Sequence, residues 1–298
     1  GAGAVTLDPN TTLHLAGVQI VNTVNISGDP NVAVTGANSL NSIVGSGDVH
    51  ILGTSGDATT DVLTLNGPNA YTADTFIGDG TAAAAATLRG GSANALSASS
   101  TTTVTVNSIL DLNGFDQAIG ALAGAGTVTN SGAGAATLTA NGNNNSTIFS
   151  GVIEDGSAVT ELTKTGTGTL TLSGTNTFTG ATTINGGRLM VDGSIASSSG
   201  VQVNAGGTVG GSGVLSSTTV AGGGTLTPGS LTAALTVNGN LTFDPGATYA
   251  VQVSPTAAGR TNVSGTASLG GAAYVNFSPG NYTRGSTTIL SAAGGFGG

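Results

Sequence analysis

The densest acidic stretch of the chain contains four aspartates, Asp57, Asp61, Asp74 and Asp79. Clustered carboxylates bind calcium or act as acid and base on sugars, as in polysaccharide-cleaving enzymes, often beside a Lys or Arg. Arg89 is the only basic residue near this stretch. Because Asp also favours turns, we interpret the four, and the pair Glu154-Asp155, as solvated turn residues.

The two histidines, His14 and His50, are candidate metal ligands or catalytic bases. Each lies in a run that alternates with Leu, Val or Ile, so we expect both to be outward-facing strand residues. The sequence has no G-x-S-x-G nucleophile turn and no nucleophile triad. Gly78-Asp79-Gly80 is a single fragment of a calcium-binding Gly-Asp repeat. The sequence therefore predicts no catalytic, cofactor-binding or metal-binding residue.

Charge is scarce, and it is distributed along the chain. The formal net charge is −9. The five basic residues are Arg89, Lys164, Arg188, Arg260 and Arg284. Phosphate recognition needs clustered Lys or Arg, so this distribution argues against nucleic acid and against anionic membrane surfaces as partners. The absence of cysteine excludes disulfides and Cys-ligated zinc.

Short alternating runs are the elements that must position any functional group. They include Val5–Leu7, Leu13–Leu15, Val18–Ile20, Val24–Ile26, Val32–Val34 and Val49–Ile51. Their period of two, their Val and Ile content and the intervening Gly, Asn, Asp or Pro predict β-strands. The run Ala82–Ala86 is too short for a stable helix, so we expect a packed turn or short excursion. No apolar run approaches the roughly 18 residues that a membrane-spanning helix needs.

A repeat indicates how these strands are assembled. Related phrases recur with the apolar anchors Ile184, Val203, Val220 and Val237, spaced 17 to 19 residues apart. A recurring unit of roughly twenty residues is typical of a solenoid, in which each coil buries its apolar face against its neighbours. At roughly 20 residues per coil, the chain of 298 residues would form about fifteen coils.

The stretch from Leu162 to Gly193 resembles the passenger-associated transport repeat of bacterial autotransporters. The residues that carry the resemblance are Leu162, Lys164, Gly166, Gly168, Leu170, Leu172, Ser173, Gly174, Asn176, Thr177, Phe178, Gly180, Thr182, Ile184, Gly187, Leu189 and Val191. Segments 110–130 and 143–156 also resemble passenger phrases, and the Asn143–Asn145 run inside the second is either a cleavage-prone loop or, more simply, a turn. The resemblance implies an all-β fold, a right-handed single-stranded parallel β-helix.

The C-terminal part resembles the autochaperone, or junction, region that precedes an autotransporter's membrane barrel. We therefore predict three parts: a β-helix stalk at 1–161, the transport repeat at 162–205 and a capping, autochaperone-like region at 206–298. Six of the eleven Phe and Tyr residues lie in this last part: Phe243, Tyr249, Tyr274, Phe277, Tyr282 and Phe296. We expect them to close the exposed core of the last coil, while a hairpin covers its unpaired edge.

The resemblance implies a non-catalytic passenger segment at the bacterial cell surface, exported through the periplasm and the outer membrane. It would act as a rigid stalk or adhesin, with C-terminal coils that template folding; Lys164 would serve the fold or its secretion. Its partners would be a surface receptor or glycan and its own membrane barrel, which this chain does not include. Two alternatives remain: a carbohydrate-active β-helix enzyme, or the stalk of an upstream enzyme domain; and a subunit that associates end to end into a filament.

Overall fold

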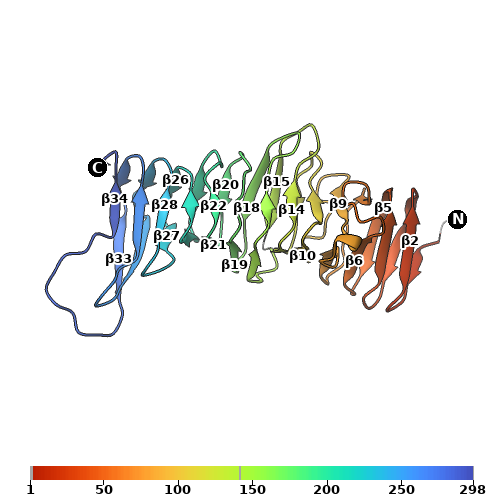
Figure 1. Cartoon of the computed structure of the whole chain (residues 1–298), viewed down its shortest axis with the longest axis horizontal. Helices are drawn as coiled ribbons and strands as arrows, with labels where there is room; N and C mark the ends of the chain where they lie inside the picture. The colour runs from red at the N-terminus through yellow and green to blue at the C-terminus, as the bar shows by residue number, and fades with distance from the viewer. Residues whose placement is uncertain (1–2, 141, 298) are drawn as a thin grey trace. The chain divides into compact units, whose positions relative to one another are not determined.

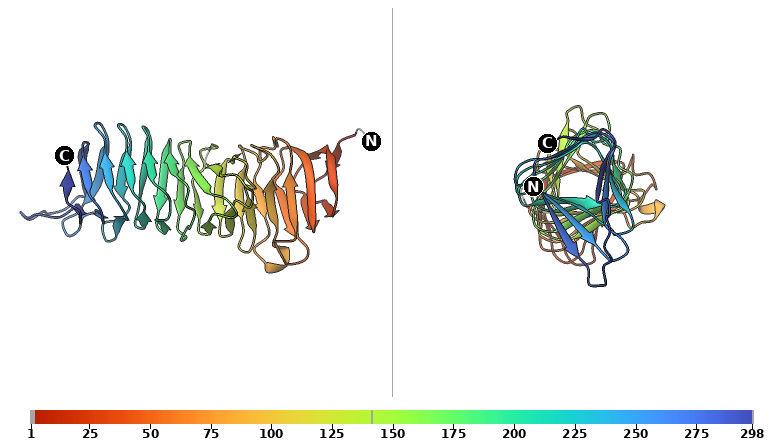
Figure 2. Two further views of the ribbon diagram at one scale, coloured as in Figure 1. Left: turned by 90° about the horizontal axis from the view of Figure 1, so that it is seen from above. Right: turned by 90° about the vertical axis from the view of Figure 1, so that its left-hand side faces the viewer.

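The computed structural model describes residues 3–140 and 142–297. These form two compact units, Gly1–Glu161 and Leu162–Gly298, and each is a parallel β-solenoid (Figure 1). In Figure 2 the strands of each unit follow one another as parallel rungs. The described residues contain no α-helix, and none of their segments qualifies as a membrane-spanning helix. The alanine run forms the predicted excursion, a single 3₁₀ turn, η1 (Ala82–Ala84).

The first unit contains three parallel sheets. The first sheet consists, in spatial order, of β1 (Val5–Leu7), β3 (Gln19–Ile26), β5 (Ala37–Gly45), β7 (Val62–Leu65), β9 (Thr87–Gly90), β11 (Ile109–Asp111), β14 (Thr127–Thr129) and β17 (Val152–Ile153). The second consists of β2 (Thr12–Ala16), β4 (Asn31–Thr35), β6 (Val49–Gly53), β8 (Thr75–Ile77), β10 (Thr101–Val104), β13 (Ala121–Gly124) and β16 (Thr147–Phe149). The third pairs β12 (Gln117–Ala118) with β15 (Ala136–Ala140).

The second unit has the same plan. One sheet contains β19 (Thr169–Leu172), β21 (Gly187–Val191), β24 (Gly207–Gly211), β27 (Thr225–Pro228), β30 (Thr248–Val253) and β33 (Ala272–Phe277). Another contains β18 (Thr160–Lys164), β20 (Thr182–Ile184), β23 (Val201–Val203), β26 (Thr218–Val220), β29 (Leu241–Phe243), β32 (Ala267–Leu269) and β35 (Phe296–Gly297). The last contains β22 (Ser194–Ile195), β25 (Val214–Leu215), β28 (Ala234–Val237), β31 (Arg260–Val263) and β34 (Leu290–Ala292).

Columns of apolar side chains fill the interior, because equivalent residues of successive coils lie one above the other. In the first unit such a column consists of Leu63, Leu88, Leu110, Val128 and Ile153, all nearly or fully buried. In the second unit one consists of Leu170, Leu189, Val209, Leu226 and Tyr249. Burying each aliphatic side chain contributes about 2 kcal/mol, so these columns supply much of the driving force for stacking.

The outward positions of the same strands form columns of Thr and other polar residues. Thr169 pairs with Arg188, which pairs with Thr208. Since neighbours in a column are residues of successive coils, charged residues of one sign would repel one another along it. The low charge of the sequence therefore follows from the stacking.

Two sequence predictions about strands are wrong in detail. The sequence separates Val18–Ile20 from Val24–Ile26, whereas one strand, β3, joins Gln19 and Ile20 to the second run, with an irregular register between Ile20 and Thr23. The predicted repeat anchor Val237 is also displaced. Val220 pairs with Phe243, whereas Val237 lies in another sheet and pairs with Val263. Every sheet repeats the same alternation, so the pattern alone does not identify the sheet to which a strand belongs.

The coils are fewer than the fifteen predicted. The sheet that contains β2 and β19 has seven strands in the first unit and six in the second, which corresponds to about twelve turns. The coils are longer than twenty residues where loops are inserted. Ile77 and Val104 are partners in adjacent coils although 27 residues separate them.

The capping predicted for the C-terminal aromatics holds only in part. Phe243 and Tyr249 are buried and meet edge to face, with ring centroids 5.9 Å apart. The other four, Tyr274, Phe277, Tyr282 and Phe296, are 43% to 66% exposed. Most of β33 is exposed because no coil of the described chain lies beyond it, and the following loop projects outward instead of covering this edge (Figure 1).

A column of glycines shows how closely the coils approach. Gly174, Gly193 and Gly213 occupy equivalent places in three successive coils. A Cβ atom on Gly193 would lie 2.0 Å from the carbonyl oxygen of Gly174, and one on Gly213 would lie 1.9 Å from that of Gly193. No side chain fits there without moving the backbone of the neighbouring coil.

We expect Gly193→Ala to lower the free energy of unfolding by about 3 kcal/mol, within the range for overpacking, because the new methyl group would collide with the backbone of the neighbouring coil. The matched control is Gly200→Ala, where a Cβ would meet only the Ser217 carbonyl oxygen, at 3.7 Å. Denaturant titration of both variants measures the difference. Equal stabilities would show that the glycine column does not constrain the stack.

Candidate functional site

A buried corner follows β19 in the second unit. Asn176 is 3% exposed and donates its side-chain amide to the carbonyl oxygens of Gly174 (3.1 Å) and of Ser194 in the next coil (3.0 Å). Two residues later, Phe178 is fully buried. Thr182, also fully buried, shares a hydrogen bond of 3.1 Å with the Ser198 hydroxyl. We call this arrangement the Asn corner.

The first unit contains a second Asn corner, after β7. The Asn69 side chain donates to the carbonyl oxygen of Gly67 (2.7 Å) and to that of Ala95 in the next coil, and Tyr71 occupies the place of Phe178. Thr75 occupies the place of Thr182 and bonds a serine hydroxyl of the following coil at 2.7 Å. Two stretches distant in sequence therefore build the same polar and aromatic corner.

The two corners differ in one hydroxyl. The Tyr71 hydroxyl lies 2.8 Å from that of Thr75, which in turn contacts Ser100. Burial raises the pKa of Tyr71 to about 12, against the opposing effect of these two hydroxyls. Tyr71 is thus neutral at physiological pH and completes a hydroxyl chain between two coils. The hydrogen bonds of the corner hold adjacent coils in register. Its side chains do not change protonation near neutral pH, so they are unsuited to acid–base chemistry.

The four aspartates of the acidic stretch have different roles in the structure, and Asp61 is the buried one. This residue is fully buried, and its carboxylate accepts hydrogen bonds from the backbone amides of Gly36 (2.9 Å), Thr54 (2.7 Å) and Ser55 (2.6 Å) and from the Ser55 hydroxyl (2.7 Å). Burial opposes ionisation, but the four hydrogen bonds outweigh it and lower the pKa of Asp61. Asp61 therefore joins turns of the fold, and its predicted solvation is wrong.

Asp57 and Asp79 are exposed turn residues, as predicted. Each carboxylate accepts bonds from the amide and hydroxyl of the residue two positions later, Thr59 and Thr81 respectively. The threonine hydroxyl is the larger cause, and the amide the second, of the lowered pKa of each aspartate. Both form local Asx turns.

Asp74 belongs to a ladder of carboxylates that join coil to coil. It accepts the amide of Thr101 at 3.1 Å, while its own amide donates to Asp48 at 2.8 Å. Asp48 is bonded in the same way to Asp29, at 3.3 Å. The sequence places Asp74 beside Asp57, but in the structure its partners come from the preceding and following coils.

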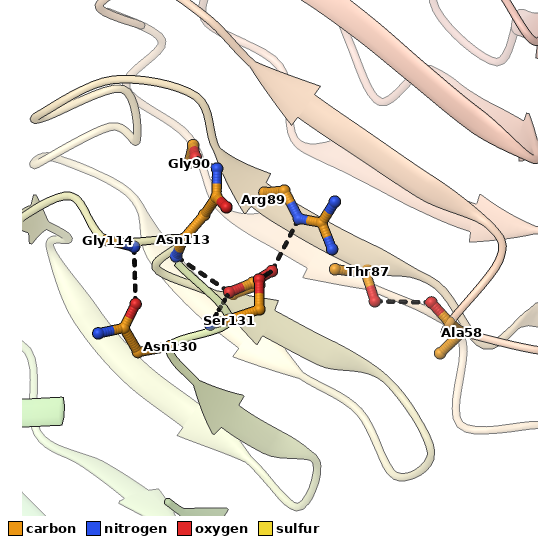
Figure 3. A network of polar contacts seen from close by, with 9 residues as sticks. Ala58, Thr87, Arg89, Gly90, Asn113, Gly114, Asn130 and Ser131 are labelled. Atoms are coloured by element: carbon orange, nitrogen blue, oxygen red, sulfur yellow. Dashed lines mark hydrogen bonds and ion pairs between the residues drawn. The ribbon is translucent and has the colours of Figure 1, made fainter. Parts of the chain in front are cut away.

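A further polar network, absent from the sequence predictions, surrounds Asp111, and Figure 3 labels its partners Arg89, Asn113 and Ser131. Arg89 donates its Nε–H to the Asp111 carboxylate over 2.7 Å, the single ion pair among the described residues. The amides of Asn113 and Ser131 donate to the same carboxylate over 2.9 Å each, and the Ser131 hydroxyl donates over 2.6 Å. Arg89 and Asp111 are one coil apart in the sequence, and this spacing could have predicted their pairing. Recognising it requires the length of that coil, which the sequence does not reveal.

The histidines remain apart from these networks. His14 is exposed, and His50 is half-buried and stacks on Phe76, with ring centroids 4.7 Å apart. Both face outward on the second sheet, as predicted. In residues 3–140 and 142–297 no group of three or more His, Cys, Asp or Glu side chains is placed to hold a metal ion.

The remaining predicted turn residues join neighbouring segments. Asp155 accepts the amide of Thr160 at 2.8 Å. The Glu154 carbonyl oxygen accepts the Thr160 hydroxyl at 2.8 Å. Asn143 and Asn145 both direct their side-chain amides to the Thr101 hydroxyl, at 3.2 and 3.1 Å. Whether the asparagine run is cleaved remains a prediction.

Lys164 is the least expected of these residues, because it is fully buried at an inward position. It stands above Ile184 and Val203 in an apolar column. Its ammonium donates to the backbone carbonyl oxygens of Thr165 and Gly186. Burial lowers the pKa of Lys164 from 10.5 to about 8.

We expect Asp61→Asn to destabilise the fold by about 1–3 kcal/mol, because the new amide group presents donors to a site made of donors. The control Asp57→Asn changes an exposed turn and should have little effect. Because the pKa of Asp61 is lowered on folding, its contribution is present above the unfolded value near 3.8 and is lost as pH falls through the folded value. Urea unfolding from pH 7 to pH 3 tests this; the prediction fails if both variants match the parent chain.

Lys164→Met should change the pH dependence of stability. The folded-state pKa is about 8 and the ordinary value 10.5, so between these values the folded chain releases the proton that the unfolded chain retains. Stability of the parent chain should therefore rise relative to the variant, by about 1.4 kcal/mol per pH unit over this window. Unfolding curves from pH 7 to pH 10.5 measure the difference, and parallel profiles would contradict the prediction.

Comparison with known proteins agrees with the two Asn corners. Residues 60–81 and 162–191 match the family described as passenger-associated-transport-repeat, and these segments contain Asn69 and Asn176, the asparagines of the two corners. No curated protein matches the chain. Only the second segment was predicted from the sequence, although Leu63, Leu65 and Gly67 have the spacing of Leu170, Leu172 and Gly174. The repeats and the β-solenoid that contains them match the passenger domain of an autotransporter.

Proposed function

We propose that the chain is a rigid, non-catalytic passenger segment, a stalk or adhesin exposed at the bacterial surface after export through the periplasm and the outer membrane. The observation that supports this most is the presence of an Asn corner, within the matched repeat, in each of two parallel β-solenoid units. The coils of 206–298 act in addition as a template on which upstream coils fold.

Rigidity follows from the way each coil is bonded. Backbone groups of a coil pair with the coil on either side, and buried Asn, Thr and Asp side chains add bonds at the turns. Sliding one coil over the next would break a whole row of these bonds and would leave buried polar groups unpaired, at a cost of about 1–3 kcal/mol for each group. A stack of this kind suits a spacer that resists bending.

The position of the carboxylates supports a non-catalytic role. The passenger repeat is not a catalytic family. Asp61 and Asp111 are buried and fully engaged by backbone amides and hydroxyls, and Asp74 is bonded along its ladder. An acid–base pair for sugar cleavage needs free carboxyl groups facing a common cleft. These three carboxylates therefore support the fold instead of facing a common cleft.

The template role is supported by the pairing near the C-terminus. β30 and β33 are joined through six residue pairs, from Thr248 with Ala272 to Val253 with Phe277. Other strand pairs of the second unit join two to four residues. The first coil of a solenoid has no neighbour to pair with, so within the second unit folding begins most readily where one pairing is extensive. An added coil then needs only the edge before it.

Deleting residues 206–298 should leave the remaining chain sensitive to protease, because the upstream coils lose the template. A deletion of similar length at the other end, residues 1–91, leaves the template in place and should leave the rest resistant. Limited proteolysis, with fragments identified by mass spectrometry, compares the two. Equal resistance of both truncated chains would refute the template role and would leave the stalk role untouched.

A further inference from the structure

The C-terminal segment differs in charge from the rest of the chain. Asp244 is the last acidic residue, so residues 245–298 contain two arginines, Arg260 and Arg284, and no Asp or Glu. The complete chain has a formal charge of −9. In residues 245–298 the positive charges of the two arginines are therefore not balanced by any carboxylate, which favours a negatively charged partner for this segment.

A pocket of about 520 Å³ lies in this segment, between the turn after β30 and the loop after β33. This loop projects from the coils and is drawn in dark blue in Figure 1. Phe277 and Tyr282 provide aromatic walls, Ser254 and Thr256 provide hydroxyls on one side, and Arg284 lies among the lining residues. The volume lies within the usual range for small-molecule sites.

The aromatic walls are held in place. The Tyr282 hydroxyl lies 3.0 Å from the carbonyl oxygen of Val253 and 2.6 Å from that of Ser278. Its ring meets Phe277 edge to face, with centroids 5.5 Å apart and an interplanar angle of 87°. Gln252 donates to the Ser278 hydroxyl over 3.1 Å. The first part of the loop is thus tied to the end of β30, which reduces the entropy lost on binding.

A second pocket, of about 210 Å³, adjoins the first. Thr287 lines both, and Arg260 lines the second. Arg260 and Arg284 are both exposed, and neither forms an ion pair among the described residues. Together the two pockets form a double pocket, with one arginine in each part and Thr287 lining both.

The chemistry of the double pocket favours an acidic sugar chain. A guanidinium binds a carboxylate through two parallel N–H donors. The negative face of an aromatic ring attracts the C–H groups on the apolar face of a sugar ring, and Ser and Thr hydroxyls exchange hydrogen bonds with sugar hydroxyls. Polyphosphates such as nucleic acid require denser positive charge than two arginines. We propose that the double pocket binds a carboxylate-bearing oligosaccharide, with one acidic sugar at each arginine.

This site does not depend on the template role of 206–298, because its lining residues act in the folded chain. Both arginines are exposed, so each contact is weakened by salt and a single site binds weakly. Several copies displayed on one cell would bind a polymeric ligand more tightly than one copy does.

Isothermal titration of the full chain with tetragalacturonate tests the proposal, with a neutral tetramer of galactose and tetraglutamate as comparison probes. The acidic sugar should bind, and the two comparison probes should bind at least tenfold more weakly or not at all. Arg284→Gln and Arg260→Gln should each weaken binding about fivefold, the upper end of the effect expected for loss of an exposed charged contact. Thermal unfolding of these variants should match that of the parent, because both side chains are exposed.

Arg188→Gln is the matched control, because it removes the same charge from an exposed arginine on β21, outside the double pocket. It should bind as the parent does. Three results would overturn the proposal: no binding of tetragalacturonate at millimolar concentration, equal weakening by all three arginine variants, or binding of tetraglutamate as tight as that of the sugar. The last result would assign the site to acidic peptides.

Discussion

Pairing of each coil with the next is the interaction on which this structure depends. A solenoid coil has no partners of its own for its backbone amides and carbonyls, so it takes them from the coils above and below. Equivalent residues must then lie directly over one another. The apolar columns, the outward Thr columns and the Gly174–Gly193–Gly213 contact are consequences of this alignment.

Within this frame the Asn corner has a clear physical role. Turns are the places where parallel coils lose their regular hydrogen bonds, and unpaired buried groups there would be costly. Asn69 and Asn176 supply the missing donors to two carbonyl oxygens each, one in the same coil and one in the next. The asparagines and the aromatic residues two positions after them, Tyr71 and Phe178, are all buried. The corner therefore fixes the register at the point where slippage would begin.

The strands and the solenoid architecture could be predicted from the sequence, because alternation and a repeat near twenty residues are local properties. The assignment of strands to sheets could not. Val237 has the same alternating surroundings as Val220, yet it lies on β28, the third strand of its coil, and the true partner of Val220 is Phe243. The number of coils was overestimated for the same reason, since inserted loops are invisible to a count that assumes a constant repeat.

The polar groups were predicted less well than the strands. Asp57 and Asp61 are alike in sequence, but one lies in an exposed turn while the other is enclosed by amides from Gly36 and Thr54. Which of the two is buried depends on a segment one coil away, and sequence proximity does not report this. The sequence suggested that Lys164 serves the fold, but it did not predict that the side chain is buried. Lys164 is buried because it lies on the inward-facing side of β18.

The unequal lengths of the coils have a consequence for variation between related chains. Ile77 and Val104 pair although 27 residues separate them, whereas Val209 and Leu226 pair across 17. Extra residues are accommodated in loops outside the stack, without altering the partners of any strand. New surface features can therefore be inserted at a turn and diversify independently, while the scaffold beneath them keeps its geometry.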